Sequence, residues 1–287
     1  MSVAAMDAPR RHPILQALRG LAREPRAAVG LAVVALAVAM AAAAPWLAPY
    51  DPEIPDFTAI LAAPDGAHPF GTDDLGRDVL SRIIFGARAS ILVGFFSVAG
   101  ALAVGALAGL AAGYFGRWID AAIMRVMDVV FAFPSILLAL AITAVLGPSL
   151  RNAILAIAVV NLPVFARIAR AQTIVVRELD YVEAQRALGF GSGAILFRTV
   201  LPNITAPLIV QGSLLFASAI ITESYLSFLG LGVQPPTPTW GNMLRNAIGF
   251  LDMAPWLAWF PGLAIFLVVL GFNLLGDGLR DRFDPRD

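Results

Sequence analysis

The most constraining feature of this sequence is a series of apolar runs without a charged residue, each long enough to cross a lipid bilayer. A hydrocarbon core about 30 Å thick needs roughly 20 apolar residues in helical conformation. Five such runs cover residues 27–50, 89–116, 129–150, 199–222 and 253–276. Backbone groups in lipid must be hydrogen-bonded within their own segment, which a helix achieves. The sequence therefore predicts an all-α polytopic membrane protein.

A sixth, shorter apolar run covers residues 152–166. We count it as a span because Arg151 and Arg167 stand at its two ends, where their long side chains can reach the membrane surface. Six transmembrane helices put both termini on the same side of the membrane. Without this span, the Arg-rich segment that follows it would fall on the opposite side from the other Arg-rich segments.

The basic residues determine which side faces the cytoplasm. All 20 are Arg, and 15 of them fall in four segments on one predicted side of the membrane. Those segments are residues 1–26, 117–125, 167–198 and 280–286. Cytoplasmic loops carry the excess of positive charge, so both termini are predicted to be cytoplasmic. The chain then divides into a cytoplasmic N-terminal segment, 1–26, and a transmembrane domain, 27–287.

The Arg-rich start and the small residues before Pro45 leave one alternative, a cleaved signal peptide over residues 1–45. The uncharged run 27–50 is 24 residues long, whereas the apolar region of a signal peptide has about 7–15 residues. Its length therefore favours an uncleaved first span.

Composition excludes several kinds of chemistry. The chain has no Cys and only two His, His12 and His68, so disulfides, thiol chemistry and a histidine-rich metal site are not expected. It also has no Lys, and a Walker phosphate-binding loop requires one. Any ATP that drives this protein is therefore hydrolysed by another chain. The formal net charge is +0, which gives no general attraction to nucleic acid.

The predicted cytoplasmic loop, 167–203, contains the most informative stretch of the chain. Asp180 followed by Glu183 predicts a helix cap with a reciprocal partner, an Asp variant of the capping box. A short helix over 181–188 should follow and stop at Gly189, which can adopt the left-handed conformation found at helix ends.

A second short helix is expected after this stop. Ser192 is a candidate cap for a helix that runs to about Val200, and Pro202 should keep Leu201 out of helical geometry. The result is two short helices joined by a glycine elbow (Gly189, Gly191 and Gly193). Such a structure protrudes from the membrane and offers a rigid lever to a partner.

This loop resembles the EAA loop of bacterial ABC-importer permeases. The spacing of Glu183-Ala184, Gly189 and Leu201-Pro202 matches it, with Gln185 in place of the second Ala and Thr199 where Ile or His is usual. In that family the loop forms coupling helices that dock into a cleft on the ATPase subunit. The resemblance assigns this role to Glu183, Ala184, Arg186, Gly189, Leu201 and Pro202. Glu183 and Gly189 also have a purely structural interpretation, as helix cap and helix stop, and both roles can hold together.

The outer segment, 51–88, carries a second resemblance. The stretch 68–94 is similar to the region before the second helix of the C-type permease in dipeptide, oligopeptide and nickel importers. Stretches 223–244 and 259–286 resemble the same subfamily, including an Asp284-Pro285-Arg286 end. The matching residues of the outer segment are Gly71, Thr72, Asp73, Gly76, Arg77, Asp78, Ser81 and Arg82.

The outer segment has two physical interpretations. Thr72 or Asp73 can cap a helix from Asp74 onward, which would lie as an amphipathic helix on the outer surface. In the first interpretation this helix only positions the next span, and its charges are solvated. Alternatively, it forms a contact surface for a partner permease or a docked binding protein.

Two acidic residues intrude on the predicted spans. Asp128 has Arg125 three residues earlier on the same helix face, which favours a paired, structural role. Glu223 lies near the outer surface, in a network that packs or gates the helices or, alternatively, on the path of a peptide's cationic N-terminus. A pathway role is the weaker alternative for Asp128 too. Pro134 and Pro163 are expected to kink their helices.

The resemblance implies a type I ABC importer permease in the bacterial inner membrane, most simply for peptides. Its expected partners are a second homologous permease, two ATPase subunits and an extracytoplasmic binding protein, surrounded by lipid. The second permease is a different chain in the related systems, although a second copy of this one is open. ATP and Mg²⁺ would bind the partner ATPases, with no cofactor or catalytic residue in this chain.

Import of nickel or a nickel complex by the same machinery is the main alternative. A secondary transporter would need buried ion relays, for which only Asp128 is a candidate. A membrane-embedded enzyme would need clustered nucleophiles or metal ligands, which this composition does not supply.

Overall fold

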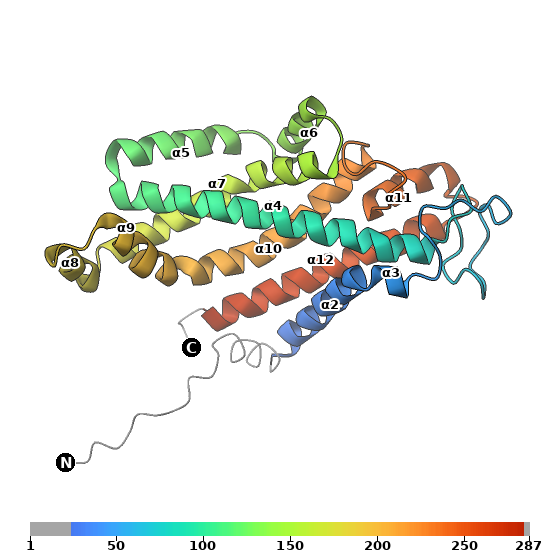
Figure 1. Ribbon diagram of the computed structural model, residues 1–287, viewed down its shortest axis with the longest axis horizontal. Coiled ribbons are helices and arrows are strands. Elements are labelled where there is room, and N and C mark those ends of the chain that lie inside the picture. The colour runs from blue at the N-terminus through green and yellow to red at the C-terminus, as the bar shows by residue number, and fades with distance from the viewer. Residues whose placement is uncertain (1–23, 284–287) are drawn as a thin grey trace, which may run out of the picture.

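The computed structural model describes residues 24–283 as a bundle of helices (Figure 1). Most of the predicted N-terminal segment, residues 1–23, and the Asp284-Pro285-Arg286 end lie outside the described residues. The helices are α2 (Pro25–Ala42), α3 (Ala44–Leu47), α4 (Val79–Phe115), α5 (Arg117–Phe131), α6 (Ser135–Leu146), α7 (Leu150–Arg177), α8 (Asp180–Ala187), α9 (Ser192–Ile195), the π-helix η1 (Leu196–Val200), α10 (Leu201–Phe228), α11 (Trp240–Ala247), the 3-10 turn η2 (Ile248–Phe250) and α12 (Trp256–Phe283).

Within residues 24–283, five helices are long and apolar enough to cross a membrane. They are α2, α4, α7, the continuous helix 192–228 that contains α10, and α12. The short run 152–166 lies inside α7, which has 28 residues and continues through Pro163, so counting it as a span is consistent with the helix length.

The third predicted span, 129–150, is not one helix. It is replaced by α5 and α6, which are bent by 89° relative to each other at the break around Pro134. Proline has no N–H and disfavours helical geometry in the residue before it, so the expected kink becomes a complete break. The spans number six when this bent pair is counted as one.

Helices α4 and α7 lie side by side and form the centre of the bundle (Figure 1). Gly105, Gly109 and Gly113 follow one another at intervals of four residues and face α7 so closely that an added Cβ atom would lie within 2.9 Å of α7 atoms. Small residues at this spacing allow helix backbones to approach in a membrane. We missed this motif in the sequence, although its spacing was visible there.

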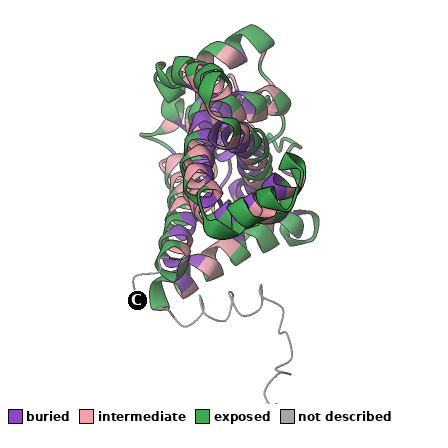
Figure 2. Ribbon diagram, turned by 90° about the vertical axis from the view of Figure 1, so that its left-hand side faces the viewer, coloured by how far each residue is buried: buried purple, intermediate pink, exposed green. Residues whose placement is uncertain are grey.

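Seen along the bundle, buried residues gather between the helices and exposed ones face outward (Figure 2). A second close approach joins α2 to α12, where Cβ atoms added at Gly30 and Gly271 would meet the opposite helix within 2.7 Å. Phe216 of α10 stacks on Phe272 of α12 at 4.0 Å. These contacts join α2 and α10 to α12 through small residues and aromatic stacking.

The two ends of the bundle differ. Helices α8 and α9 lie at one end, toward which α2 begins and α12 terminates, while α11 and the loops of the outer segment lie at the other (Figure 1). The Arg-rich side therefore coincides with the end that carries α8. This arrangement agrees with the predicted topology.

Candidate coupling loop, outer network and intramembrane charges

The first short helix of the cytoplasmic loop begins without the predicted capping box. Leu179 has extended backbone angles (φ −79°, ψ 141°) and is the N-cap, with no side-chain hydrogen bond to the helix. Asp180 and Glu183 instead lie in the first turn of α8. Acidic residues there interact favourably with the positive end of the helix dipole. The prediction that Asp180 caps the helix was wrong because its backbone is already helical.

The stop at Gly189 is confirmed. Its φ of +83° is in the left-handed region. The N–H of Gly189 donates to the carbonyl of Arg186 and the N–H of Phe190 to that of Gln185, each at 3.0 Å. This pair of bonds is a Schellman motif, which satisfies the last carbonyls of α8.

The second half of the loop differs from the prediction in two ways. The N-cap of α9 is Gly191 rather than Ser192, and no side chain caps it. Leu201 is helical (φ −55°, ψ −46°), so the chain runs without interruption through η1 into α10. A proline ring collides with the carbonyl four residues earlier, here that of Arg198, and the wider π turn at this point gives it room. Pro202 therefore reshapes the helix instead of ending it.

Three apolar side chains project from the loop: Leu188, Phe190 and Phe197 are 77%, 52% and 56% exposed. Glu183 and Ala184 are exposed as well. Glu183 makes no ion pair with any part of the chain that the structure describes. The loop thus presents an apolar tip with an unpaired carboxylate beside it.

Several contacts hold the loop to the bundle. The guanidinium of Arg186 lies over the Tyr114 ring at 5.2 Å, and Arg177 Nη1 donates to the carbonyl of Gly113 over 2.7 Å. A cation there complements the carbonyl end of α4. The hydroxyl of Thr199 donates to Oε1 of Gln185 over 2.9 Å. The loop is therefore attached to α4 on one side and to the start of α10 on the other.

In the outer segment, the helix begins later than predicted. Asp78, not Thr72 or Asp73, is the N-cap, and its carboxylate accepts from the Ser81 N–H over 2.8 Å. The helix then continues without interruption as α4 to Phe115, 37 residues in all. A separate amphipathic helix on the outer surface is therefore not formed. Residues 71–77 are held in a loop because Gly71 and Gly76 have positive φ angles of 73° and 75°.

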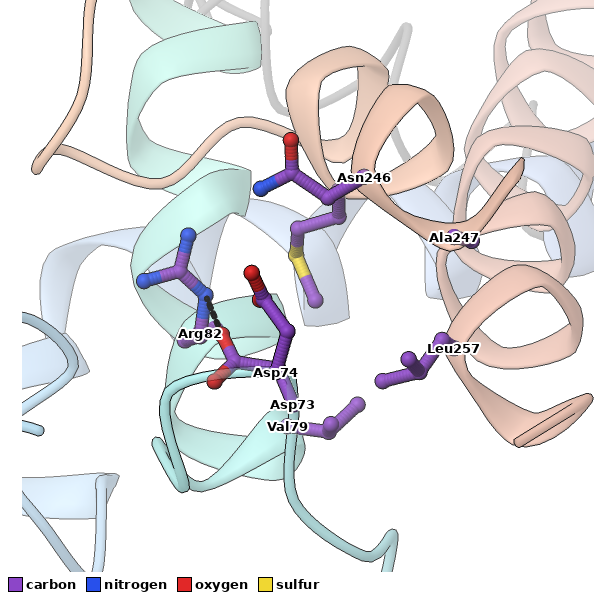
Figure 3. Close-up of a pocket in the computed structure, with 8 residues that line it drawn as sticks. Asp73, Asp74, Val79, Arg82, Asn246, Ala247 and Leu257 are labelled. Carbon is purple, nitrogen blue, oxygen red and sulfur yellow. Dashed lines mark ion pairs between the residues drawn. The ribbon is translucent and has the colours of Figure 1, made fainter. Parts of the chain in front are cut away.

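The charges before α4 are buried, which contradicts the interpretation in which they are solvated. Asp73 accepts from Arg77 Nε over 2.8 Å and lies 3.4 Å from Arg82 Nε (Figure 3). All three side chains are at most 8% exposed. Arg82 also donates to the carbonyl of Pro52 over 2.8 Å. Arg77 and Arg82 thus share the carboxylate of Asp73, and Arg82 has a second partner in the backbone. These charged groups form a network whose partners all belong to the chain itself.

The remaining residues of the outer segment signature belong to the same network. The Thr72 hydroxyl accepts from the Ala62 N–H over 2.8 Å. Ser81 donates to Asp78 over 2.7 Å, and the His68 ring lies 3.0 Å from the same carboxyl group. A Cβ added at Gly76 would lie 1.7 Å from the Asp56 carbonyl.

Two of the signature stretches meet in space. Nε1 of Trp240 donates to the carbonyl of Ile83 over 3.0 Å, and Nε1 of Trp256 donates to that of Thr72 over 3.2 Å. Val79 and Leu257 face each other across a cavity of about 10 Å³ beside Asp73 and Arg82 (Figure 3). A cavity of that size holds about one water molecule. The outer segment is therefore bound to the start of α11 and α12.

Glu223 is completely buried near the outer end of α10. Ser227 donates to its Oε1 over 2.7 Å and Ser90 of α4 to its Oε2 at 3.4 Å. It has no ion-pair partner among residues 24–283. The carboxyl group thus links α10 to α4 through hydroxyl groups.

Asp128 is paired, but not with Arg125. Its Oδ1 lies 2.8 Å from Nη2 of Arg167 on α7. A second pair, Asp120 with Arg170, also joins α5 to α7, at 2.5 Å and 2.6 Å. In the sequence, Arg167 marks one end of the run 152–166, and Arg170 adds only to the positive charge of the cytoplasmic side. Their acidic partners lie 39 and 50 residues away, and no local spacing indicates such pairs.

Comparison with known proteins agrees with this architecture. Residues 105–286 match the family described as the binding-protein-dependent transport system inner membrane component. Residues 13–64 match the N-terminal TM domain of oligopeptide transport permease C. Among solved structures, an inward-facing MetNI methionine ABC transporter has a TM-score of 0.56 at 17% identity, covering 70% of this chain and 95% of that one. This likeness supports the fold.

Curated relatives cover nearly the whole chain. The dipeptide transport system permease protein DppC of Alkalihalophilus pseudofirmus is 49% identical over 274 residues, 96% of this chain and 90% of the relative. The glutathione transport system permease protein GsiD of Pectobacterium atrosepticum is 47% identical over 260 residues, 90% and 86% of the two chains. The chain therefore belongs to the inner-membrane components of binding-protein-dependent transport systems, as a non-catalytic, multi-pass C-type ABC-importer permease.

Proposed function

We propose that this permease forms half of a pathway for the uptake of peptides and transmits ATP-driven motion to it. The coupling loop is the feature that carries this proposal. It combines an exposed apolar tip, Leu188 and Phe190, with an elbow whose left-handed Gly189 has a defined geometry. Peptide cargo is supported by relatives named for dipeptides, di/tripeptides and glutathione, each 47–49% identical.

The partners follow from the resemblance and from the surfaces of the loop. Two ATPase subunits bind ATP and Mg²⁺, and each receives one coupling loop, with Glu183, Ala184 and Arg186 on the docking helix. Leu201 and Pro202 continue the loop into α10, so that a push on the loop reaches a membrane span directly. A second, homologous permease closes the pathway, and it is a different chain in the proposed complex.

The binding protein delivers cargo at the opposite end. The outer network from Gly71 to Arg82 is buried and holds the loops before α4 in one shape, so it supports this docking end rather than contacting the partner with its own charges. Glu223 lies between α4 and α10, where it serves the packing or gating of these helices. ATP-driven closure of the ATPases draws the coupling loops together and opens the pathway outward, and hydrolysis resets it.

Reconstitution of this chain with the products of its neighbouring genes tests the proposal. ATP-dependent uptake of a labelled dipeptide into liposomes is compared for the wild type and Gly189→Pro. Proline requires φ near −65°, which is incompatible with +83°. The matched control is Gly193→Ala, because an added Cβ at Gly193 meets nothing within 4 Å and its φ is not in the left-handed region.

Uptake should depend on the ATPase subunits and be lost in Gly189→Pro while Gly193→Ala transports normally. Gly189→Pro should still assemble, which is checked by co-purification. Uptake by this chain alone, or uptake indifferent to ATP, would instead indicate a secondary transporter. Competition by nickel complexes but not by dipeptides would identify the alternative cargo.

A further inference from the structure

The break between α5 and α6 is exposed over its whole length. Ala132, Phe133 and Pro134 are outside any helix, and all residues from 131 to 137 are exposed in this chain. Non-helical backbone at membrane depth is stable only when other protein covers it or when it lines a water-filled cavity. This part of the chain therefore does not face lipid.

An exposed ion pair lies beside the break. The side chains of Asp128 and Arg167 are 60% and 43% exposed, and the Arg167 guanidinium lies 4.2 Å from the centre of the Phe131 ring. The neighbouring pair of Asp120 and Arg170 is less exposed, at 20% and 36%. Charged groups within membrane spans face the bundle interior or a water-filled cavity. Of the two pairs, only Asp128 with Arg167 lies next to the helix break.

Two independent counts place this pair inside the bundle, away from the loops at its cytoplasmic end. Asp128 lies 11 residues after Arg117, where α5 begins, and Arg167 lies 10 residues before Arg177, where α7 ends. At 1.5 Å per residue, each count corresponds to about 15 Å from the cytoplasmic helix ends. Arg167 directly follows the apolar run 152–166, so the pair lies inside the bundle at the cytoplasmic end of the hydrocarbon core, next to the break.

We propose that Asp128, Phe131, Phe133 and Arg167 line the water-filled pathway, where the ion pair opens to receive the oppositely charged ends of a passing peptide. Arg167 receives the terminal carboxylate and Asp128 the terminal ammonium group. An exposed pair exchanges partners readily because water already weakens it. Arg167 contacts Asp128 through Nη2, and its planar fork of donors matches a carboxylate. This inference rests on the proposed peptide uptake.

The first test uses the absence of Cys from the chain. Single variants Phe133→Cys, Leu36→Cys and Phe266→Cys are made in the assembled complex and treated with a charged, water-soluble thiol reagent. Leu36 and Phe266 are 70% and 58% exposed on apolar spans and serve as controls. A thiolate forms in water and not in hydrocarbon, so Phe133→Cys should react at least about tenfold faster than either control. Equal reaction rates at the three positions would overturn the proposal. It would also be overturned if Phe133→Cys reacted slowly in the complex because the second permease covers it.

The second test concerns the charges. The double variant Asp128→Asn with Arg167→Gln keeps shape and polarity but removes both charges. Uptake of a free-ended dipeptide should fall about tenfold or more, because bonds to charged groups are replaced by weaker ones. ATP hydrolysis stimulated by the loaded binding protein should persist. The matched variant Asp120→Asn with Arg170→Gln should keep its uptake per folded complex.

Unchanged uptake in the Asp128→Asn, Arg167→Gln complex would overturn the inference while leaving the proposed function intact. Failure of the wild-type complex to transport peptides would instead overturn the proposed function. Equal losses of uptake in both double variants would show that the two pairs only hold α5 against α7.

Discussion

The hydroxyl of Thr199 donates to Oε1 of Gln185 over 2.9 Å and so joins η1 to α8 across the glycine elbow. These are the two positions at which the loop departs from the pattern of the family it resembles. Gln185 replaces an apolar Ala, and Thr199 stands where Ile or His is usual. Together they form a hydrogen bond that braces the loop, so the two changes compensate each other.

Replacing Thr199 by Val should loosen this brace, because valine has a similar shape but no hydroxyl. The expected loss is about 0.5–1.5 kcal/mol in the free energy of unfolding, the usual net value of one hydrogen bond. A double-mutant cycle with Gln185→Ala measures it, and the two losses should not add. Additive losses would show that the two side chains act independently.

Replacing Gly109 by Ala should destabilise the α4–α7 contact. The added Cβ would lie 2.3 Å from the Ala166 carbonyl, which is backbone and cannot move aside easily. Overpacking of this kind costs about 1–3 kcal/mol, measured as a lower melting temperature in detergent. Gly100→Ala on the same helix is the control, because its Cβ would lie 3.8 Å from the nearest atom, that of Ala158. Equal melting temperatures for the two variants would contradict the close approach.

Replacing Asp73 by Ala should leave Arg77 and Arg82 without their shared buried partner. Removal of one member of a buried ion pair costs about 3–5 kcal/mol. Denaturant titration of the purified chain should detect the loss, whereas Asp252→Ala, at an exposed position, should change stability by no more than about 0.5 kcal/mol. A small effect at Asp73 would mean that the network opens to water.

Replacing Ser227 by Ala should destabilise the protein, because the buried Glu223 carboxyl group loses one of its two hydroxyl donors. The buried carboxyl group loses the 2.7 Å bond, at a cost of about 1–3 kcal/mol. The control is Ser224→Ala, since the Ser224 hydroxyl donates only to the carbonyl of Ile220 in its own helix. Thermal unfolding of the two variants in detergent distinguishes them. If both melt alike, Glu223 does not depend on Ser227.

Much of the fold was predictable because it depends on local properties of the chain. The spans follow from the length of uncharged runs, and the short run 152–166 was recognised as a span through its terminal arginines. The stop at Gly189 follows from the steric freedom of glycine at positive φ. The predicted caps at Asp180 and Ser192 were wrong because α8 and α9 begin one residue earlier than a cap there requires, with N-caps at Leu179 and Gly191 and no side-chain cap. The predicted cap at Thr72 or Asp73 was wrong because α4 begins only after Asp78, beyond the loop that contains Gly71 and Gly76.

What the sequence by itself determined is therefore which segments enter the membrane, which side faces the cytoplasm and where the coupling loop bends. These features depend on the transfer free energy of apolar side chains, on charge and on backbone sterics. All three are properties of residues that are neighbours in the sequence, so the sequence alone reveals them. Pro134 also indicated a bend in the third span, which the structure shows as a break of 89° between α5 and α6. The tertiary structure alone decided that Asp128 pairs with Arg167 and that Asp73 binds two buried arginines. These features depend on contacts between segments brought together only when the helices pack, and no local pattern specifies them.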